Sequence, residues 1–235
     1  MRSKRNIVEL QQAFVLHSRP FRDQSILVNL LTENNGHVSA VVYVGSSKKS
    51  NKKGLLQPFS CLNVDIQGRN DLKNLSYVEL AQKSISLAGN HLFSGFYINE
   101  LMVRLLPENI ALEQLFSLYK QSLSELENKS DIEPILRKFE MCLLQELGLS
   151  LDFSEINEAT ATESLYCYLP EQGFVLAEFA NNSPTYNGQH LIDIGYGKLL
   201  NRDVLLTSKR LMRQVLKSYL GNAPLHSRKL FRSNN

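Results

Sequence analysis

Residues 25–44 read SILVNLLTENNGHVSAVVYV. Two apolar runs rich in Ile, Leu and Val, at residues 25–31 and 37–44, flank a polar turn that ends in Asn35-Gly36. An Asn-Gly pair between two such runs is the strongest short-range signal for a β-hairpin. The stretch therefore predicts two antiparallel strands, and the sheet must be completed by the sequence on either side.

Three further strands are predicted around this hairpin, at residues 12–19, 55–66 and 75–80, with a turn at residues 67–71. Five strands in about 80 residues, with little helix between them, are typical of a small barrel. The OB-fold is the commonest barrel of this length, so we predict a five-stranded OB-fold.

The apolar period changes to three and four after about residue 84, which indicates amphipathic helices. Four helices are predicted, at residues 92–106, 112–126, 135–147 and 207–220. Asp131 and Pro134 occupy cap and first-turn positions of the third, and Gly148 and Gly221 follow the third and fourth. The predicted fold class is α+β: an OB-fold nucleic-acid-binding domain at residues 1–83, then a mainly helical domain at residues 84–235 with a small β-hairpin insertion around residues 160–180.

The segment between the third and fourth predicted strands, residues 45–54, reads GSSKKSNKKG. Its four lysines, Lys48, Lys49, Lys52 and Lys53, are not interrupted by any acidic residue. We expect a flexible, positively charged loop at the tip of a β-hairpin, suited to a chain of phosphates. The alternative is a loop that only improves solubility.

Other cations are expected to line a groove on the barrel. Arg19 and Arg22 flank Pro20-Phe21 at a strand end, and Arg69 and Lys73 lie in or beside the turn before the last strand. The candidates for base stacking are Phe14, Phe21, Tyr43 and Phe59. A place in the core is the alternative for each aromatic residue, and it is favoured for Phe14 and Phe59.

The end of the chain is a second basic region, because residues 204–235 contain no acidic residue. Lys209, Arg213 and Lys217 recur every four residues and so share one helix face, and Arg228 follows them. A solvated helix face is the alternative to a phosphate-binding surface. Residues 99–178 have the opposite sign, with 15 acidic against 5 basic residues, although the whole chain has a net charge of only +3.

Signals of catalysis, metal binding and export are weak. Cys61, Cys142 and Cys167 form no CxxC pair, the five histidines are scattered, and no Walker A or GxSxG motif is present. We therefore expect no cofactor, no metal and no enzymatic activity. The charged N-terminus lacks the apolar stretch of a signal peptide, and no run approaches the roughly 18 apolar residues of a membrane span.

Several runs together resemble the bacterial RecO family of DNA repair proteins, which are recombination mediators. They include AFVLHSRPF at residues 13–21, LQPF at 56–59, LFSGFYINEL at 92–101, RKFE at 137–140 and SRKLF at 227–231. The resemblance spans nearly the whole chain in order. Some members carry a four-cysteine zinc site, but only Cys167 lies in that region here, so the chain resembles the zinc-free branch.

The resemblance implies a cytoplasmic, nucleoid-associated protein that binds single- and double-stranded DNA, anneals complementary strands and helps recombinase to load. It also implies two protein partners, RecR and the acidic, apolar C-terminal tail of single-stranded DNA-binding protein. Arg137 and Lys138, beside an apolar helix stripe, are the expected contacts for that tail. Two alternatives are a protein–protein adaptor with incidental DNA contact and, with less support, a hydrolase whose carboxylates are assembled by the fold.

Overall fold

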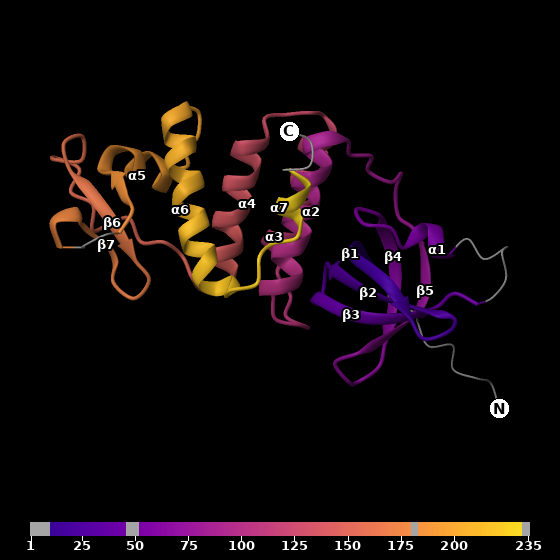
Figure 1. The fold of residues 1–235 in the computed structure, drawn as a ribbon. Coiled ribbons are helices and arrows are strands. Elements are labelled where there is room, and N and C mark those ends of the chain that lie inside the picture. Colours follow the sequence, from indigo (N-terminus) through magenta and orange to yellow (C-terminus); the bar gives the residue numbers. More distant parts are fainter. Residues whose placement is uncertain (1–9, 46–51, 180–182, 232–235) are drawn as a thin grey trace.

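The computed structural model describes residues 10–45, 52–179 and 183–231. Figure 1 shows three parts in a row: a β-barrel at one end, a group of helices in the middle and a small β-sheet at the other end. The barrel is formed by the first third of the chain, and the helices and the small sheet by the remainder.

The barrel contains five strands and is closed. Its strands are β1 (Gln11–Phe21), β2 (Ser25–Thr32), β3 (Gly36–Tyr43), β4 (Cys61–Gln67) and β5 (Lys73–Leu80). The order is β1-β2-β3-β5-β4, with β4 returning to pair with β1 and only β3 and β5 parallel. This is an OB-like barrel, so the predicted α+β class with an N-terminal barrel is confirmed.

The β2–β3 hairpin is also confirmed. Its two strands pair along their full length, and the last pair joins Thr32 to Gly36. Gly36 has φ 63°, a backbone conformation that only glycine adopts without strain. A Cβ atom at this position would lie 1.7 Å from the carbonyl oxygen of Ile110, so the loop after α2 also requires glycine here.

The predicted hairpin around the lysine segment is wrong, because β3 and β4 are not neighbours in the barrel. The predicted strand at residues 55–66 is also too long. Residues Lys52–Leu55 form a short helix, α1, and β4 begins at Cys61. Residues 56–60, between α1 and β4, do not extend the strand. Leu56 is fully buried in the barrel core, and Pro58 has no amide hydrogen to donate in a sheet.

All four predicted helices are present, with slightly shifted ends, and the described residues after the barrel also contain three short helical segments that, like α1, were not predicted. The long helices are α2 (Gly89–Leu105), α3 (Glu113–Glu127), α4 (Ile132–Glu146) and α6 (Arg202–Leu220). The short segments are η1 (Ala177–Phe179), α5 (Gly188–Gly195) and α7 (Ser227–Leu230). Gly148 and Gly221 adopt positive φ directly after α4 and α6, as expected for helix ends. Asp131 is the N-cap of α4, but its side chain makes no capping hydrogen bond.

The small sheet consists of β6 (Leu165–Leu169), β7 (Gly173–Leu176) and β8 (Thr185–Asn187). β6 and β7 form an antiparallel hairpin, and β8 pairs with the other edge of β6. Tyr166, Tyr168, Phe174 and Tyr186 are buried and belong to the same hydrophobic core as the helices, so this sheet is packed against α5 and α6.

The barrel and the helices share one apolar interface. Alternate residues of β1 point into the barrel, such as Ala13 and Val15, whereas Phe14 and Leu16 join the core of the helices. The Phe14 ring lies 5.5 Å from the ring of Phe116 and 5.2 Å from that of Tyr119. Phe14 and Phe59 are therefore core residues and not stacking residues, as the sequence favoured.

Candidate nucleic-acid interface

The outer surface of β1, β2 and β3 carries cations beside one exposed and one half-buried aromatic ring, those of Tyr43 and Phe21. Strand register places Arg19, Leu27 and Val41 in one row and Phe21, Ser25 and Tyr43 in the next. Residues paired across a sheet point to the same side, so Arg19, Phe21 and Tyr43 share one face. Tyr43 is 64% exposed, and its hydroxyl donates to Gln24 Oε1 at 2.5 Å.

Arg22 extends this surface, and we call Arg19, Phe21, Arg22 and Tyr43 the barrel face. Arg22 occupies the β1–β2 turn with φ 52°, and its guanidinium lies 5.2 Å from the centre of the Phe21 ring. A cation held against an aromatic ring can meet both the phosphate and the base of a single strand. The barrel face therefore has the chemistry of a platform for single-stranded nucleic acid.

The remaining predicted cations of the barrel lie on other elements. Lys52 and Lys53 are exposed on α1, and Lys48 and Lys49 lie outside the described residues. Arg69 is exposed in the β4–β5 turn, and Lys73 is half-buried where β5 starts beside β3. These cations are not arranged in one row, and strand register places only Arg19 and its neighbours on the barrel face.

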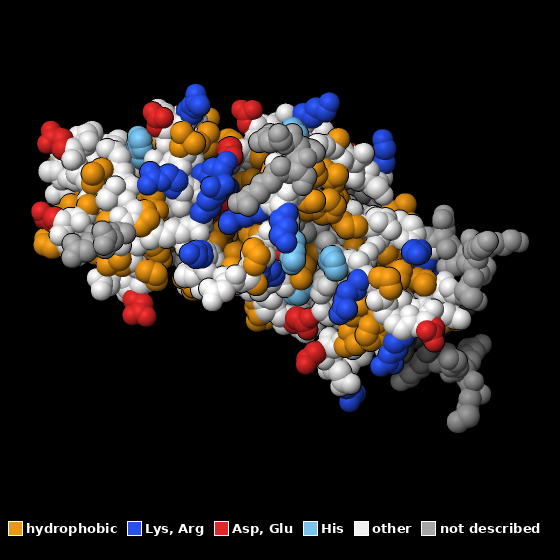
Figure 2. Space-filling view, in the orientation of Figure 1, with side chains coloured by type: hydrophobic (Ala, Val, Ile, Leu, Met, Phe, Trp, Pro, Cys, Tyr) orange, Lys and Arg blue, Asp and Glu red, His pale blue; other side chains and the backbone are white. Residues whose placement is uncertain are grey.

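A second group of cations lies on α6 and α7, and Figure 2 shows blue side chains gathered over this region. Lys209, Arg213 and Arg228 line one pocket of about 470 Å³ between α2, α4, α6 and α7, which we call the basic pocket. Lys217 lines a smaller adjoining hollow of about 200 Å³, which also includes Arg228. The fold therefore brings Lys209 and Arg213 to one pocket, as their helical spacing indicated, and adds Arg228 from α7, whereas Lys217 lines the adjoining hollow.

Arg137 also lines the basic pocket, although its side chain is only 4% exposed. Its Nη2 donates to Glu140 Oε1 at 2.9 Å, and the Tyr97 hydroxyl donates to the same oxygen at 2.5 Å. Burial raises the pKa of Glu140, opposed by the charge of Arg137, and burial together with Glu140 raises the pKa of Tyr97. Arg137 Nε has no hydrogen-bond partner within the described part of the chain.

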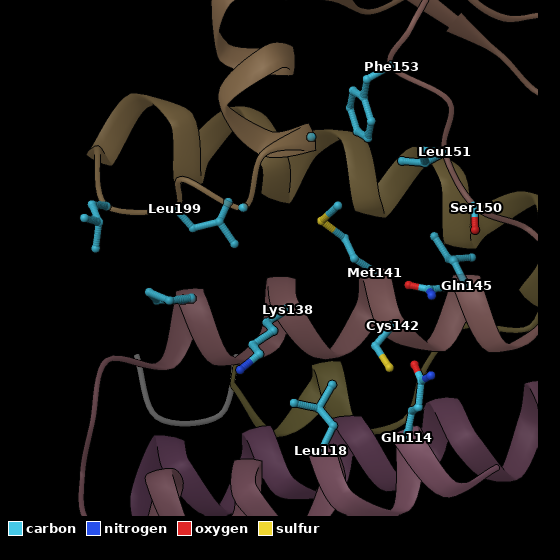
Figure 3. A pocket seen from close by; sticks show the side chains of 15 residues that line it. Gln114, Leu118, Lys138, Met141, Cys142, Gln145, Ser150, Leu151, Phe153 and Leu199 are labelled. Carbon is cyan, nitrogen blue, oxygen red and sulfur yellow. The ribbon is translucent and has the colours of Figure 1, made fainter.

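Lys138 is the neighbour of Arg137 but is exposed on a different side of α4. It lines a larger hollow of about 690 Å³ between α3, α4 and the loop after α5, which we call the apolar groove. Figure 3 shows Leu118, Met141, Leu151, Phe153 and Leu199 around this groove, with the side chain of Lys138 projecting from α4. The two predicted partner contacts, Arg137 and Lys138, therefore belong to two different cavities.

Sequence reasoning missed the residues that hold the C-terminal segment in place. The Glu100 carboxylate accepts hydrogen bonds from the backbone N–H groups of His226 and Ser227, both at 2.8 Å, and from the Ser227 hydroxyl at 2.7 Å. Arg104, one turn later on α2, donates to the carbonyl oxygens of Leu220 and Ala223. The spacing of Glu100 and Arg104 by four residues marked an ion pair, but nothing in the sequence showed that both side chains reach residues 220–227.

Within the described residues, no group of three His, Cys, Asp or Glu side chains is arranged to hold a metal ion. In the same part of the chain, no helix has the length and apolarity needed to cross a bilayer. Cys61 and Cys167 are buried, Cys142 is half-buried, and all three are free thiols.

This chain combines an OB-like barrel, which carries basic and aromatic residues on its outer surface, with helices that carry a second basic surface. This combination is typical of nucleic-acid-binding proteins. Two family models match the chain: "Recombination protein O N terminal" over residues 7–83 and "Recombination protein O C terminal" over residues 88–229. The chain belongs to the RecO family.

Similar full-length proteins carry the name "DNA repair protein RecO". The protein of Cellvibrio japonicus is 42% identical over 229 residues, which cover 95% of this chain and 97% of the relative. That of Pseudoalteromonas atlantica is 39% identical over 227 residues, covering 95% of this chain and 94% of the relative. Membership of this family supports a role in DNA repair and recombination.

Proposed function

We propose that this protein binds single- and double-stranded DNA, anneals complementary strands and helps recombinase to load on single-stranded DNA during repair. The main support is the presence of two basic surfaces, the barrel face and the cations of α6 and α7, on a chain of the RecO family. Two separate surfaces can each hold one strand, and phosphate neutralisation on both brings the strands close together. Annealing by this route needs no active-site chemistry.

The electrostatic part of the proposal is tested by the salt dependence of oligonucleotide binding. Neutralising about six phosphates of a single strand predicts a slope of roughly −4 in a plot of log K against log salt. Fluorescence anisotropy between about 50 and 300 mM salt, roughly a sixfold range, measures this slope. An affinity that hardly changes with salt would contradict the proposal.

The lysine segment is tested by strand annealing. The wild type is compared with a variant in which alanine replaces Lys48, Lys49, Lys52 and Lys53. The variant should bind all sequences more weakly, because phosphate contacts carry no sequence information. Unchanged affinity and annealing would mean that this segment only improves solubility. Arg69 in the β4–β5 turn and Lys73 at the start of β5 are proposed as further phosphate contacts and are tested by the same assay.

The protein partners we propose are RecR and the C-terminal tail of single-stranded DNA-binding protein. The apolar groove favours such a tail, because it offers apolar side chains beside the cation Lys138 and a tail of this kind combines apolar and acidic residues. Lys138→Ala should weaken binding of a tail peptide, and Met141→Glu should abolish it. Lys129→Ala, a cation replacement beyond the end of α3 and outside the groove, is the control.

An adaptor that binds proteins and touches DNA incidentally is the second candidate, favoured by the size of the same groove. It predicts that removal of the basic residues leaves partner binding and repair in cells intact. We place the protein in the cytoplasm, in association with the nucleoid, and imaging of a fluorescent fusion before and after DNA damage tests this location.

A further inference from the structure

The basic pocket has more positive charge than its own carboxylates balance. Arg137, Lys209, Arg213 and Arg228 line it, whereas the acidic side chains in or beside it are Glu133 and Glu140. Arg137 is paired with Glu140 and Lys209 with Glu133. Among the described residues, neither Arg213 nor Arg228 has a carboxylate within 4.0 Å. Arg213 and Arg228 therefore add two positive charges that no close ion pair in the described structure neutralises, although the charge of Arg228 acts on Glu140 from a greater distance.

The pocket also contains a buried donor without an acceptor. Arg137 Nε is inaccessible to solvent and makes no hydrogen bond in the described structure, although Nη2 of the same guanidinium is bonded to Glu140. A buried N–H group that lacks a partner costs about 1–3 kcal/mol. Because Nε itself is closed to solvent, an anion in the pocket meets Arg137 only at the atoms that line the pocket, where a guanidinium can donate through more than one nitrogen. Glu133 Oε2 and Glu140 Oε2 are also buried without a partner among the described residues.

Arg228 is kept at the pocket by contacts with α2. The Glu100 carboxylate binds the first residues of α7, and Arg104 binds the carbonyl oxygens before it. The guanidinium of Arg228 lies 6.0 Å from the centre of the Tyr97 ring, and both residues line the basic pocket together with Arg137. Arg228 is thus positioned before any ligand arrives, which lowers the entropy cost of binding.

We propose that the basic pocket binds one phosphate group of the DNA backbone, with Arg137, Arg213 and Arg228 as donors. This inference rests on the DNA binding proposed above and assigns it to a defined site. It also gives Arg137 a role toward DNA, whereas the sequence placed it among contacts to a protein tail.

Two observations favour a phosphate of DNA over the carboxylate of a protein tail. The positive charge continues beyond the pocket to Lys217, in the hollow that shares Arg228, as a chain of phosphates requires. The apolar groove, on another side of α4, offers a protein tail more apolar side chains than the basic pocket, where Tyr97, Ile132, Leu136 and Phe231 are the apolar and aromatic lining. A single carboxylate would use only the pocket and leave Lys217 without a ligand.

The first test observes the Arg137 side chain by NMR in the full-length protein with ¹⁵N-labelled arginine. A short single-stranded oligonucleotide should shift the Nε–Hε resonance of Arg137, assigned with the variant Arg137→Lys. Inorganic phosphate and an acidic, apolar peptide are added in parallel.

If the peptide shifts this resonance and the oligonucleotide does not, the pocket is a protein-tail site. If inorganic phosphate saturates it at lower concentration than the oligonucleotide, the ligand is free phosphate. Either result overturns the proposal.

The second test measures oligonucleotide affinity for Arg213→Ala and Arg228→Ala. Each should weaken binding about tenfold, and the double variant should lose less than the product of the two effects, because both groups hold the same phosphate. Arg210→Ala is the matched control: Arg210 is on the same helix, but its guanidinium lies against the ring of Tyr186, 5.5 Å from the ring centre. It should change affinity less than twofold.

Equal effects of the Arg210 and Arg213 replacements would mean that only overall charge matters, and the proposed pocket site would be wrong. The two proposals also fail differently. A wild-type protein that binds no oligonucleotide refutes the proposed function together with this site. A wild-type protein that binds oligonucleotide while the Arg137 resonance is unmoved refutes the pocket alone.

Discussion

The side-chain amide of Asn99 donates a hydrogen bond to the backbone carbonyl oxygen of Leu16 at 2.8 Å. Leu16 is the position where the register of β1 against β2 shifts, so its carbonyl is not used in the regular ladder. Asn99 is buried on α2, and its own oxygen accepts from the Tyr119 hydroxyl at 2.6 Å. One amide therefore connects the bulge in the barrel with α2 and α3.

Replacing Asn99 with leucine should lower the free energy of unfolding by about 2–5 kcal/mol, because the Leu16 carbonyl and the Tyr119 hydroxyl both lose their partner inside the protein. Urea denaturation followed by circular dichroism measures the change. Asn90→Ala, an exposed asparagine in the first turn of the same helix, is the control and should cost less than about 1 kcal/mol. Equal losses in the two variants would show that the Asn99 contact does not stabilise the fold.

Gly36→Ala should be more destabilising than the strain of its backbone alone explains. A Cβ atom there overlaps the Ile110 carbonyl oxygen, so the loop after α2 must move away from the barrel. Gly148→Ala is the matched control, because Gly148 has φ 71° and no atom within 4 Å of the added Cβ. The control measures only the free-energy cost of placing a Cβ atom on a left-handed backbone, about 1–2 kcal/mol. We expect Gly36→Ala to cost at least twice as much by urea denaturation, and similar values would exclude the proposed clash.

The attachment of α7 to α2 should weaken in acid. Burial of the Glu100 carboxylate raises its pKa, but hydrogen bonds from Ser227 and His226 outweigh this and lower the pKa below its ordinary 4.5. A carboxylate with a lowered pKa in the folded state contributes stability that is present above the ordinary pKa and is lost as the pH falls through the folded value. The stability difference between the wild type and Glu100→Gln should therefore be largest at neutral pH and should narrow below about pH 4.5.

Unfolding free energies of both proteins at several pH values give this difference, and the contributions of the other carboxylates cancel in it. A gap that stays constant as the pH falls would show that the Glu100 charge does not hold α7.

Tyr43→Ala should weaken binding of single-stranded DNA by about 5- to 150-fold, because stacking of one base on an aromatic side chain contributes about 1–3 kcal/mol. Binding of duplex DNA, whose bases are already stacked, should change much less. Tyr196→Ala is the control, since Tyr196 is 66% exposed but follows α5, outside the barrel face. Fluorescence anisotropy measures the affinity for both forms of DNA. An equal loss of affinity for single strands and duplex would show that Tyr43 does not stack on bases.

The parts of the fold that were predictable from sequence are those with a local signal. Asn35-Gly36 indicated the β2–β3 hairpin, and apolar spacing indicated the four long helices. The neighbour of β3 could not be predicted, because parallel pairing with β5 joins residues more than 30 positions apart and depends on barrel closure. The lysine segment was therefore interpreted as a hairpin although its flanking strands do not pair. α5 was missed because eight residues carry too little periodicity.

In the candidate site, too, local signals were readable from the sequence and long-range contacts were not. Helical spacing placed Lys209 and Arg213 on one face, and the structure brings both to the basic pocket. The burial of Arg137 was not predictable, because it depends on Tyr97 from a helix about 40 residues earlier and on Arg228 about 90 residues later. Its pairing with Glu140, three residues further along α4, was the one local sign that this arginine is not an ordinary surface cation.

The contacts from α2 to residues 220–227 have a consequence for biosynthesis. Chains emerge from the ribosome N-terminus first, and domains fold as they appear. The barrel and α2 to α4 have their mutual partners once residues up to Glu146 have emerged, whereas Glu100 receives Ser227 only after the many residues between α4 and α7 have followed. The basic pocket, which needs Arg228, is therefore completed after the barrel and α2 to α4, and a chain truncated before Ser227 would have the barrel face but not the pocket.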